Sequence, residues 1–181
     1  RRPYHLEVLA RFERVFFPHY DRRDILLITG LIFAGIPALH YDKPERQADL
    51  ARLRNDIPAL FKGERVLEIA CGTGYWTPLI AAQAHSVLAM DYNDETLAIA
   101  RTKKYPKANV RFQRADAYAL PDWGERFSAC YAGFWWSHMP LAKIDPFLRN
   151  LAERLEPRAR VAFMDNRYVE GSSTPISRKD A

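Results

Sequence analysis

The stretch VLEIACGTGYWT, residues 66–77, joins a short apolar run that contains one carboxylate to a turn with two glycines. A strand followed by a glycine turn and a helix directs backbone N–H groups and the helix N-terminus toward a ligand. Gly72 and Gly74 allow that ligand to approach the backbone closely. The turn has no Gly-Lys-Ser/Thr sequence, which a nucleoside-triphosphate loop requires. Because the Glu68 carboxylate would repel a pyrophosphate, the stretch favours a ligand with a cationic group.

From residue 64 onward, strand-like apolar runs alternate with segments of helical periodicity. Such alternation is typical of a parallel sheet that carries helices on both faces. The expected strands are residues 65–70, 85–91, 109–116, 126–134 and 160–165, and the expected helices are a segment that begins at Pro44 and residues 77–84, 93–104 and 145–155. The sequence therefore predicts an α/β fold with a mostly parallel sheet.

Carboxylates end or flank three successive strands of this pattern. Asp91 closes the second expected strand, where a carboxylate can accept hydrogen bonds from both hydroxyls of a ribose. Asp116 closes the third, where a carboxylate can hold the exocyclic amine of an adenine. With Glu68 near the end of the first strand, these acids are expected along one edge of the sheet. That edge, at the carboxyl ends of the strands, is where ligands bind in open parallel sheets.

Residues 65–166 resemble the class I S-adenosylmethionine-dependent methyltransferases. The first motif of that family, acidic-x-Gly-x-Gly-x-Gly, is matched by Glu68, Ala70, Gly72 and Gly74, with Ala70 in place of the first glycine. The resemblance implies a three-layer Rossmann-like sandwich with S-adenosyl-L-methionine as the cofactor. It also implies methyl transfer by in-line displacement, in which the enzyme aligns the nucleophile and excludes water.

The resemblance also assigns cofactor contacts. Asp91 matches the acid that binds the ribose, and Tyr92 falls where a side chain commonly packs on the adenine. Asp116 matches the adenine-contacting aspartate, with Ala117 beside it. The expected cofactor-binding residues are Glu68, Ala70, Cys71, Gly72, Gly74, Asp91, Tyr92, Asp116, Ala117, Gly133 and Phe134.

Aromatic side chains crowd the end of the fourth expected strand. Gly133 and Phe134 occupy the family's place for the methionine part of the cofactor, and aromatic faces stabilise cations. Trp135 and Trp136 follow, and they read either as a pocket wall or as a hydrophobic cap. His138 is the candidate catalytic base that takes a proton from the acceptor. The alternative is a histidine at a helix start that is bonded to nearby backbone.

The chain divides into two expected parts. Residues 1–43 form an N-terminal helical and apolar segment, expected to act as a lid or to cover a sheet edge. Its apolar run, residues 25–39, is too short to span a bilayer. Residues 44–181 are expected to form the cofactor-binding domain, incomplete at its C-terminus because only five of the family's seven strands are found. A bare fifth strand is an exposed edge that a homodimer would cover.

The charge pattern and the two cysteines indicate which kinds of binding partner are disfavoured. The net charge is +5, but basic and acidic residues alternate along most of the chain, which favours a solvated surface over a nucleic-acid site. Cys71 and Cys130 lack metal-ligand spacing, so no metal is expected, and reduced thiols indicate a cytoplasmic protein. No Pro-Cys pair stands at the fourth strand and no Asn-Pro-Pro-Tyr motif occurs, which weakens methylation of nucleic-acid bases.

Methyl transfer to a small-molecule acceptor is the function that the sequence favours. One alternative is a module that binds S-adenosylmethionine or S-adenosylhomocysteine without catalysis, and another is a methyltransferase that acts on a protein. A nicotinamide-dependent oxidoreductase is disfavoured by Glu68, and also by Thr77, which stands where a dinucleotide fingerprint has its third glycine.

Overall fold

The computed structural model of the chain describes residues 44–136 and 139–165. The predicted lid or edge cover, residues 1–43, lies outside the described residues, and so does the candidate base His138. The predictions for these two parts therefore stay untested.

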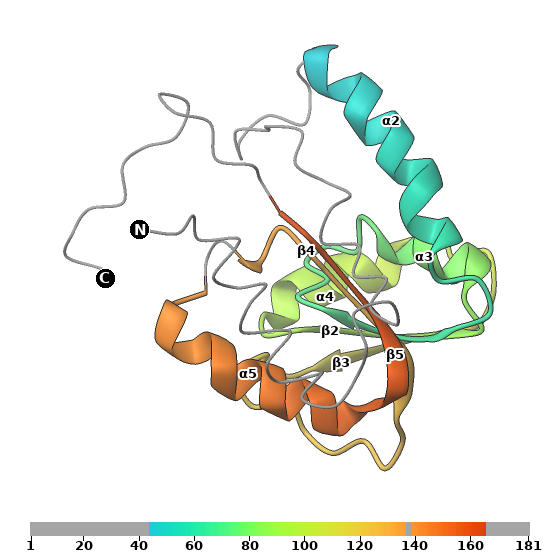
Figure 1. Cartoon of the computed structure of the whole chain (residues 1–181). Coiled ribbons are helices and arrows are strands. Elements are labelled where there is room, and N and C mark those ends of the chain that lie inside the picture. The colour runs from blue at the N-terminus through green and yellow to red at the C-terminus, as the bar shows by residue number, and fades with distance from the viewer. Residues whose placement is uncertain (1–43, 137–138, 166–181) are drawn as a thin grey trace.

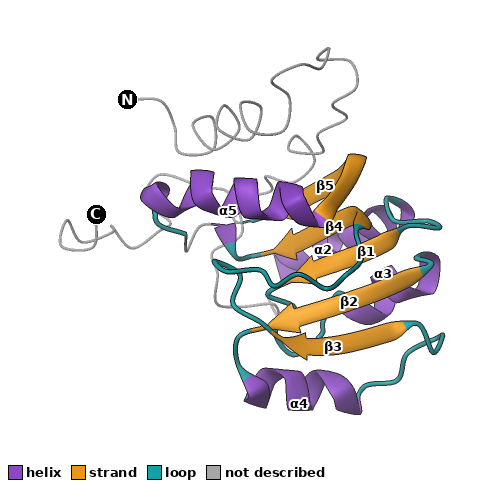
Figure 2. Ribbon diagram, turned by 90° about the horizontal axis from the view of Figure 1, so that it is seen from below, coloured by secondary structure: helices purple, strands orange, loops and turns teal. Residues whose placement is uncertain are grey.

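One five-stranded sheet forms the centre of the fold, and every neighbouring pair of strands is parallel (Figure 2). The order of the strands across the sheet is β3-β2-β1-β4-β5. Their bounds are β1 (Arg65–Ile69), β2 (Ser86–Asp91), β3 (Val110–Arg114), β4 (Phe127–Gly133) and β5 (Leu155–Met164). The chain moves outward from β1 to β3 and then returns to place β4 on the other side of β1. The carboxyl ends of β1 and β4 therefore form the switch point where ligands bind in such sheets.

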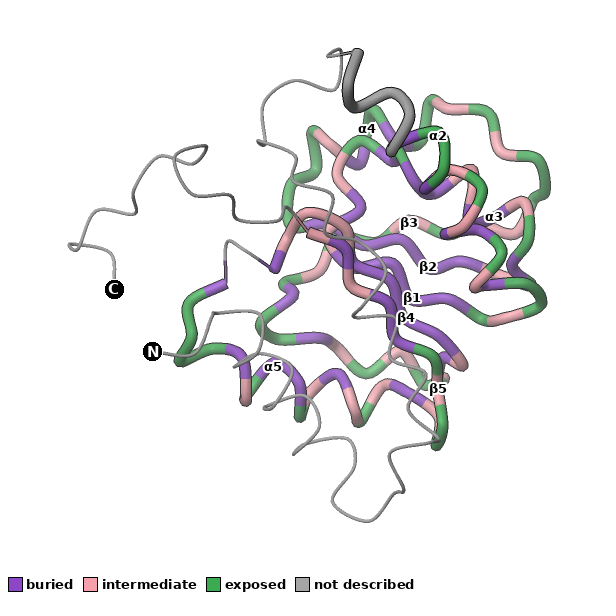
Figure 3. The backbone as a smooth tube through the Cα atoms, turned by 45° about the horizontal axis from the view of Figure 1, so that its top comes forward, coloured by how far each residue is buried: buried purple, intermediate pink, exposed green. Residues whose placement is uncertain are grey.

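Helices cover both faces of the sheet, which confirms the predicted three-layer sandwich (Figure 1). The helices are α2 (Pro44–Ala59), α3 (Thr77–Gln83), α4 (Asp94–Thr102) and α5 (Leu141–Arg154). Successive side chains of a strand point to opposite faces, so Val66 packs with α2, α3 and α4 whereas Leu67 packs with α5. The central strands are almost fully buried as a result (Figure 3).

The last two elements of the described residues, α5 and β5, are longer than predicted. Helix α5 begins at Leu141 rather than at residue 145, because its first turn supplies Ile144, which is fully buried. Strand β5 begins at Leu155, which pairs with Phe127, and a bulge then separates this pair from the regular pairing that starts at Arg160. The sequence pattern identified only the regular part of β5, because a bulge interrupts the alternation of side chains.

Within the described residues, no helix combines the length and the apolar character that crossing a bilayer requires.

Candidate functional site

The turn after β1 has an unusual backbone. Ala70, Gly72 and Gly74 have φ angles of 52°, 57° and 73°, which lie in the left-handed region that favours glycine. The turn is closed by the Cys71 N–H, which donates to the Met90 carbonyl at 2.9 Å, and by the Gly74 N–H, which donates to the Cys71 carbonyl at 2.9 Å. A Cβ atom added at Gly72 would meet nothing within 4 Å, so the space over this peptide is open to a ligand.

Ala70 is strained, because a left-handed backbone costs a residue with a Cβ atom roughly 1 kcal/mol. We expect Ala70→Gly to raise the free energy of unfolding by about 1 kcal/mol, measured by urea denaturation. The matched control is Ala82→Gly inside α3, which should lower the stability by about the same amount, because glycine weakens a helix. Equal destabilisation by both substitutions would contradict this account of the turn.

Asp91 ties the glycine turn to the end of β2. Its Oδ2 accepts the Gly72 N–H at 2.8 Å, and its Oδ1 accepts the Asn93 N–H at 2.9 Å. The side chain is only 9% exposed, so both hydrogen bonds lie in a largely dry environment. A carboxylate oxygen can accept more than one hydrogen bond, so each oxygen retains capacity for a ligand hydroxyl.

Glu68 is a buried acid directly below the turn. The residue is 2% exposed, and its Oε2 has no hydrogen-bond partner of good geometry among the described residues. Burial raises the pKa of this carboxyl to about 8, and the nearby Thr77 hydroxyl and Lys103 ammonium lower it only in part. A buried acid without a full set of partners is the feature expected where a cationic ligand completes the site.

Tyr92, Asp116 and Ala117 follow strands β2 and β3, at the edge of the sheet where the sequence predicts contacts with the adenine. Tyr92 is 60% exposed, and the Arg114 guanidinium lies 5.3 Å from its ring centroid. Asp116 follows β3 and accepts the Tyr118 N–H on its Oδ1 at 2.8 Å. Ala117 is buried beside it, so this part of the edge offers an aromatic ring, a carboxylate and a small apolar wall.

The end of β4 contributes a second strained residue. Phe134 has a φ angle of 56°, and its N–H donates to the Met164 carbonyl at 2.6 Å. A Cβ atom at Gly133 would lie 2.7 Å from the Tyr131 hydroxyl oxygen, so a larger residue there would require the Tyr131 side chain to shift. Strained backbone of this kind clusters at binding sites.

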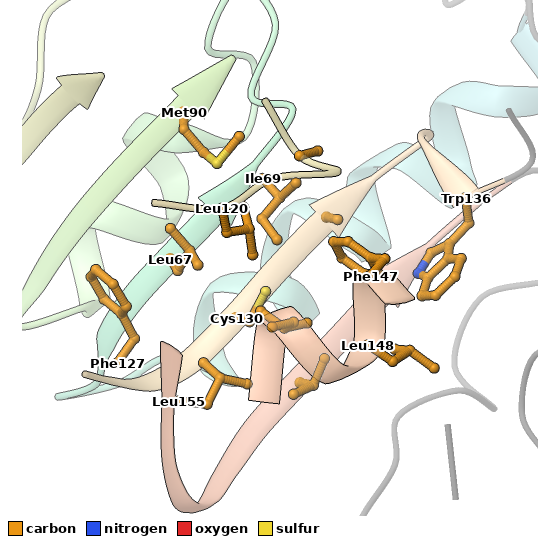
Figure 4. Packing of buried hydrophobic residues seen from close by; sticks show 14 of the residues in the cluster. Leu67, Ile69, Met90, Leu120, Phe127, Cys130, Trp136, Phe147, Leu148 and Leu155 are labelled. Atoms are coloured by element: carbon orange, nitrogen blue, oxygen red, sulfur yellow. The ribbon is translucent and has the colours of Figure 1, made fainter. Parts of the chain in front are cut away.

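Some aromatic residues in and after β4 are buried in the core, and others lie partly exposed beyond the end of the strand. Phe127 and Tyr131 are buried inside the strand. Trp136 is 5% exposed and packs edge-on against Phe147, with ring centroids 5.6 Å apart (Figure 4). Trp136 is therefore a hydrophobic cap, whereas Trp135 is only partly buried and packs against Tyr118 at 5.7 Å.

The two cysteines are structural. Cys71 and Cys130 are both buried and free, and burial raises the pKa of each thiol above its usual range. The nearby acid Glu68 raises both values further. Neither thiol is an effective nucleophile, because the nucleophilic form is the thiolate.

Sequence reasoning missed two residues of this site. Thr77 is fully buried next to Glu68, and Lys103 reaches the Gly74 carbonyl with its ammonium at 3.0 Å. The sequence marks Thr77 only as the residue that replaces a third glycine. Lys103 lies near the end of the expected helix 93–104, and no pattern in the sequence marks a contact across 29 residues.

The fold and the site together define an α/β domain of Rossmann-like architecture, with acids at the carboxyl ends of β1 and β2 around a glycine turn. Residues 66–158, half of the chain, match the family described as "Methyltransferase domain". The chain therefore belongs to the S-adenosylmethionine-dependent methyltransferases, a family whose cofactor is S-adenosyl-L-methionine.

Three known proteins illustrate the relationship. The chain is 33% identical to the demethylmenaquinone methyltransferase of Clavibacter sepedonicus over 161 residues, which cover 88% of this chain and 58% of that protein. It is 32% identical to the 2-phytyl-1,4-naphtoquinone methyltransferase of Synechococcus elongatus over 109 residues, or 57% and 46% of the two chains. A solved structure of a DhpI–SAH complex aligns with a TM-score of 0.55 at 30% identity, covering 66% of this chain and 57% of that one.

The chain spans about half the length of these two curated relatives. What the relatives act on is therefore a property of those longer proteins.

Proposed function

We propose that the chain is the cofactor-binding part of an enzyme that transfers a methyl group from S-adenosyl-L-methionine to a small-molecule acceptor. The observation that carries the proposal is the convergence of two buried acids, Glu68 and Asp91, on the glycine turn at the switch point of the sheet. The small-molecule acceptor is supported by the names of two relatives, which are both quinone methyltransferases.

The residues present fit the cofactor chemically. The incompletely partnered Glu68 carboxyl suits the ammonium of the amino-acid end, and the open space over Gly72 admits that end close to the backbone. Asp91 suits the ribose hydroxyls because both of its oxygens retain acceptor capacity. The remaining proposed contacts are Ala70, Cys71 and Gly74 in the turn, Tyr92, Asp116 and Ala117 at the adenine, and Gly133 and Phe134 at the methionine part.

The bound cofactor supplies an electrophilic methyl group on a sulfonium. The contribution of this chain is to orient the cofactor and to exclude water, because the rate of in-line displacement depends on the alignment of the nucleophile with the methyl group. Trp135 and Phe134 form apolar surface at the end of β4, where that exclusion is needed. A base that takes the acceptor's proton is still required for a hydroxyl nucleophile. His138 is proposed for that role on the sequence alone.

The proposal is tested by calorimetric titration of this chain with S-adenosylmethionine, S-adenosylhomocysteine and NADH. We expect the first two ligands to bind and NADH not to bind, because Thr77 stands where a dinucleotide-binding turn has its third glycine. Binding of NADH alone would overturn the assignment. A folded chain that binds none of the three ligands would also contradict it.

A second measurement separates the enzyme from a non-catalytic binding module. Transfer of a labelled methyl group is followed with a panel of small acceptors that includes reduced naphthoquinones, and with a panel of proteins. Transfer to a small acceptor supports the proposal, and transfer only to proteins would favour the protein methyltransferase. Cofactor binding without transfer to any acceptor would favour the binding module. The predicted homodimer is tested separately by light scattering.

A further inference from the structure

The C-terminal end of α4 folds back onto the glycine turn. Lys103 follows the last turn of the helix, where its N–H donates to the Ala100 carbonyl at 3.2 Å. Its side chain then reaches across to the turn, and the ammonium donates to the Gly74 carbonyl at 3.0 Å. The contact is partly buried, so solvent competes with it less than with a surface ion pair.

The packing at this contact is tight. A Cβ atom at Gly74 would lie 3.0 Å from the Ala100 Cβ and 3.2 Å from the Tyr105 hydroxyl oxygen. The Tyr105 hydroxyl donates to the Ala100 carbonyl at 2.7 Å, and its ring packs on Phe112 at 5.5 Å. The end of α4 therefore packs against the glycine turn. The hydrogen bond from Lys103 to the Gly74 carbonyl joins the two.

Lys103 also acts on the buried acid of the site. Within the part of the chain that the structure describes, it is the cation whose charge lowers the pKa of Glu68. The other groups that interact with Glu68 are the Thr77 hydroxyl, the thiols of Cys71 and Cys130, and the Tyr105 hydroxyl, whose pKa burial and the Glu68 charge raise to about 12. Asp91 is a further acid close to Cys71. Among these groups Lys103 alone favours the ionised carboxyl by its charge.

We propose that Lys103 is a positioning residue for cofactor binding, which holds the Gly74 carbonyl in place and whose charge favours ionisation of the buried Glu68 when a cationic ligand group binds. This inference rests on the proposed function, because it requires that Glu68 receives the ammonium of the cofactor. Lys103 acts through the turn and through Glu68.

The test compares three variants by calorimetric titration with S-adenosylhomocysteine, at intervals from pH 6.5 to pH 9. Lys103→Met keeps a long unbranched side chain and removes the charge, and Lys103→Arg keeps the charge. Lys104→Met is the matched control at the exposed neighbouring position. We expect the dissociation constant of Lys103→Met to be about fivefold or more above that of the wild type at pH 7. We expect Lys104→Met to stay within about twofold, and Lys103→Arg to recover most of the loss.

The pH dependence of the affinity loss in Lys103→Met distinguishes an electrostatic effect on Glu68 from a purely structural contact with the turn. Removing the Lys103 charge makes Glu68 harder to ionise, so the loss of affinity should be largest at low pH and should shrink as the pH passes the pKa of Glu68, about 8. A loss that is the same at every pH would show a purely structural contact and would overturn the electrostatic half of the inference. Equal affinities of Lys103→Met and Lys104→Met would overturn the whole inference while the proposed function stood. If the folded wild type did not bind S-adenosylhomocysteine, the proposed function itself would fail, and this inference with it.

Discussion

Asp91→Asn is expected to weaken binding of S-adenosylhomocysteine by roughly 10- to 100-fold, because hydrogen bonds to a charged acceptor contribute about 1.5–3 kcal/mol. In this structure the carboxylate accepts the N–H groups of Gly72 and Asn93. Under the proposed function, its remaining lone pairs accept the ribose hydroxyls. An asparagine of the same shape presents an amide N–H₂ to one of those backbone donors. We therefore also expect the free energy of unfolding to fall by about 1–3 kcal/mol.

The matched control for this substitution is Asp94→Asn, three residues further along the chain. Asp94 is exposed, and its carboxylate lies 3.6 Å from the Arg114 guanidinium in a surface ion pair, which contributes little to stability. The control should change affinity by less than about twofold and stability by less than about 0.5 kcal/mol. If Asp91→Asn bound the ligand as tightly as the control does, the ribose assignment of Asp91 would be wrong.

Glu68→Gln is expected to abolish a proton release that accompanies ligand binding. Because the pKa of Glu68 is about 8 in the ligand-free protein, most molecules carry a proton on this carboxyl at pH 7. A ligand ammonium favours the ionised form, so binding of S-adenosylhomocysteine to the wild type should release close to one proton. Calorimetry at pH 7 in two buffers of different ionisation enthalpy measures this number directly. The glutamine variant should release none.

The same carboxyl makes the ligand-free protein less stable as the pH rises. In the unfolded chain Glu68 loses its proton near the ordinary pKa of 4.5, whereas the folded protein keeps that proton up to about pH 8. Its contribution to stability is therefore fully present below pH 4.5 and declines between pH 4.5 and 8, by at most about 1.4 kcal/mol per pH unit. Relative to the wild type, Glu68→Gln should gain stability across this window, measured by urea denaturation at several pH values.

An exposed glutamate provides the control for both measurements. Glu95 lies in the first turn of α4 and is exposed, so Glu95→Gln should leave the proton release and the pH dependence of stability as they are in the wild type. Identical behaviour of Glu68→Gln and Glu95→Gln would show that Glu68 is ionised before the ligand arrives.

The sequence predicted the sheet well because the strands are nearly all buried, and buried parallel strands appear as short apolar runs. Asp91 could also be placed, since it ends its strand. The start of α5 could not be predicted, because Pro146 lies inside that helix and a proline favours a helix boundary at its own position. Ile144 in the preceding turn is fully buried, and its packing outweighs that local preference.

The site was predicted less completely than the fold. The motif match placed Glu68 beside the glycine turn, whereas the burial that gives this acid its pKa depends on packing from several elements. The left-handed backbone at Ala70 could not be predicted, because alanine rarely adopts this conformation. Lys103 was missed because its partner Gly74 lies in a different loop, and contacts between loops leave no periodic signal.

The sheet separates two layers of side chains that have different tasks. Glu68, Thr77 and Lys103 act on the side of α3 and α4, whereas the tryptophan-rich cluster around Trp136 and Phe147 packs on the side of α5. Residues without shared partners contribute to stability almost additively. Changes in the aromatic layer should therefore disturb the two acids little, so under the proposed function residues on the side of α5 can vary without loss of cofactor binding.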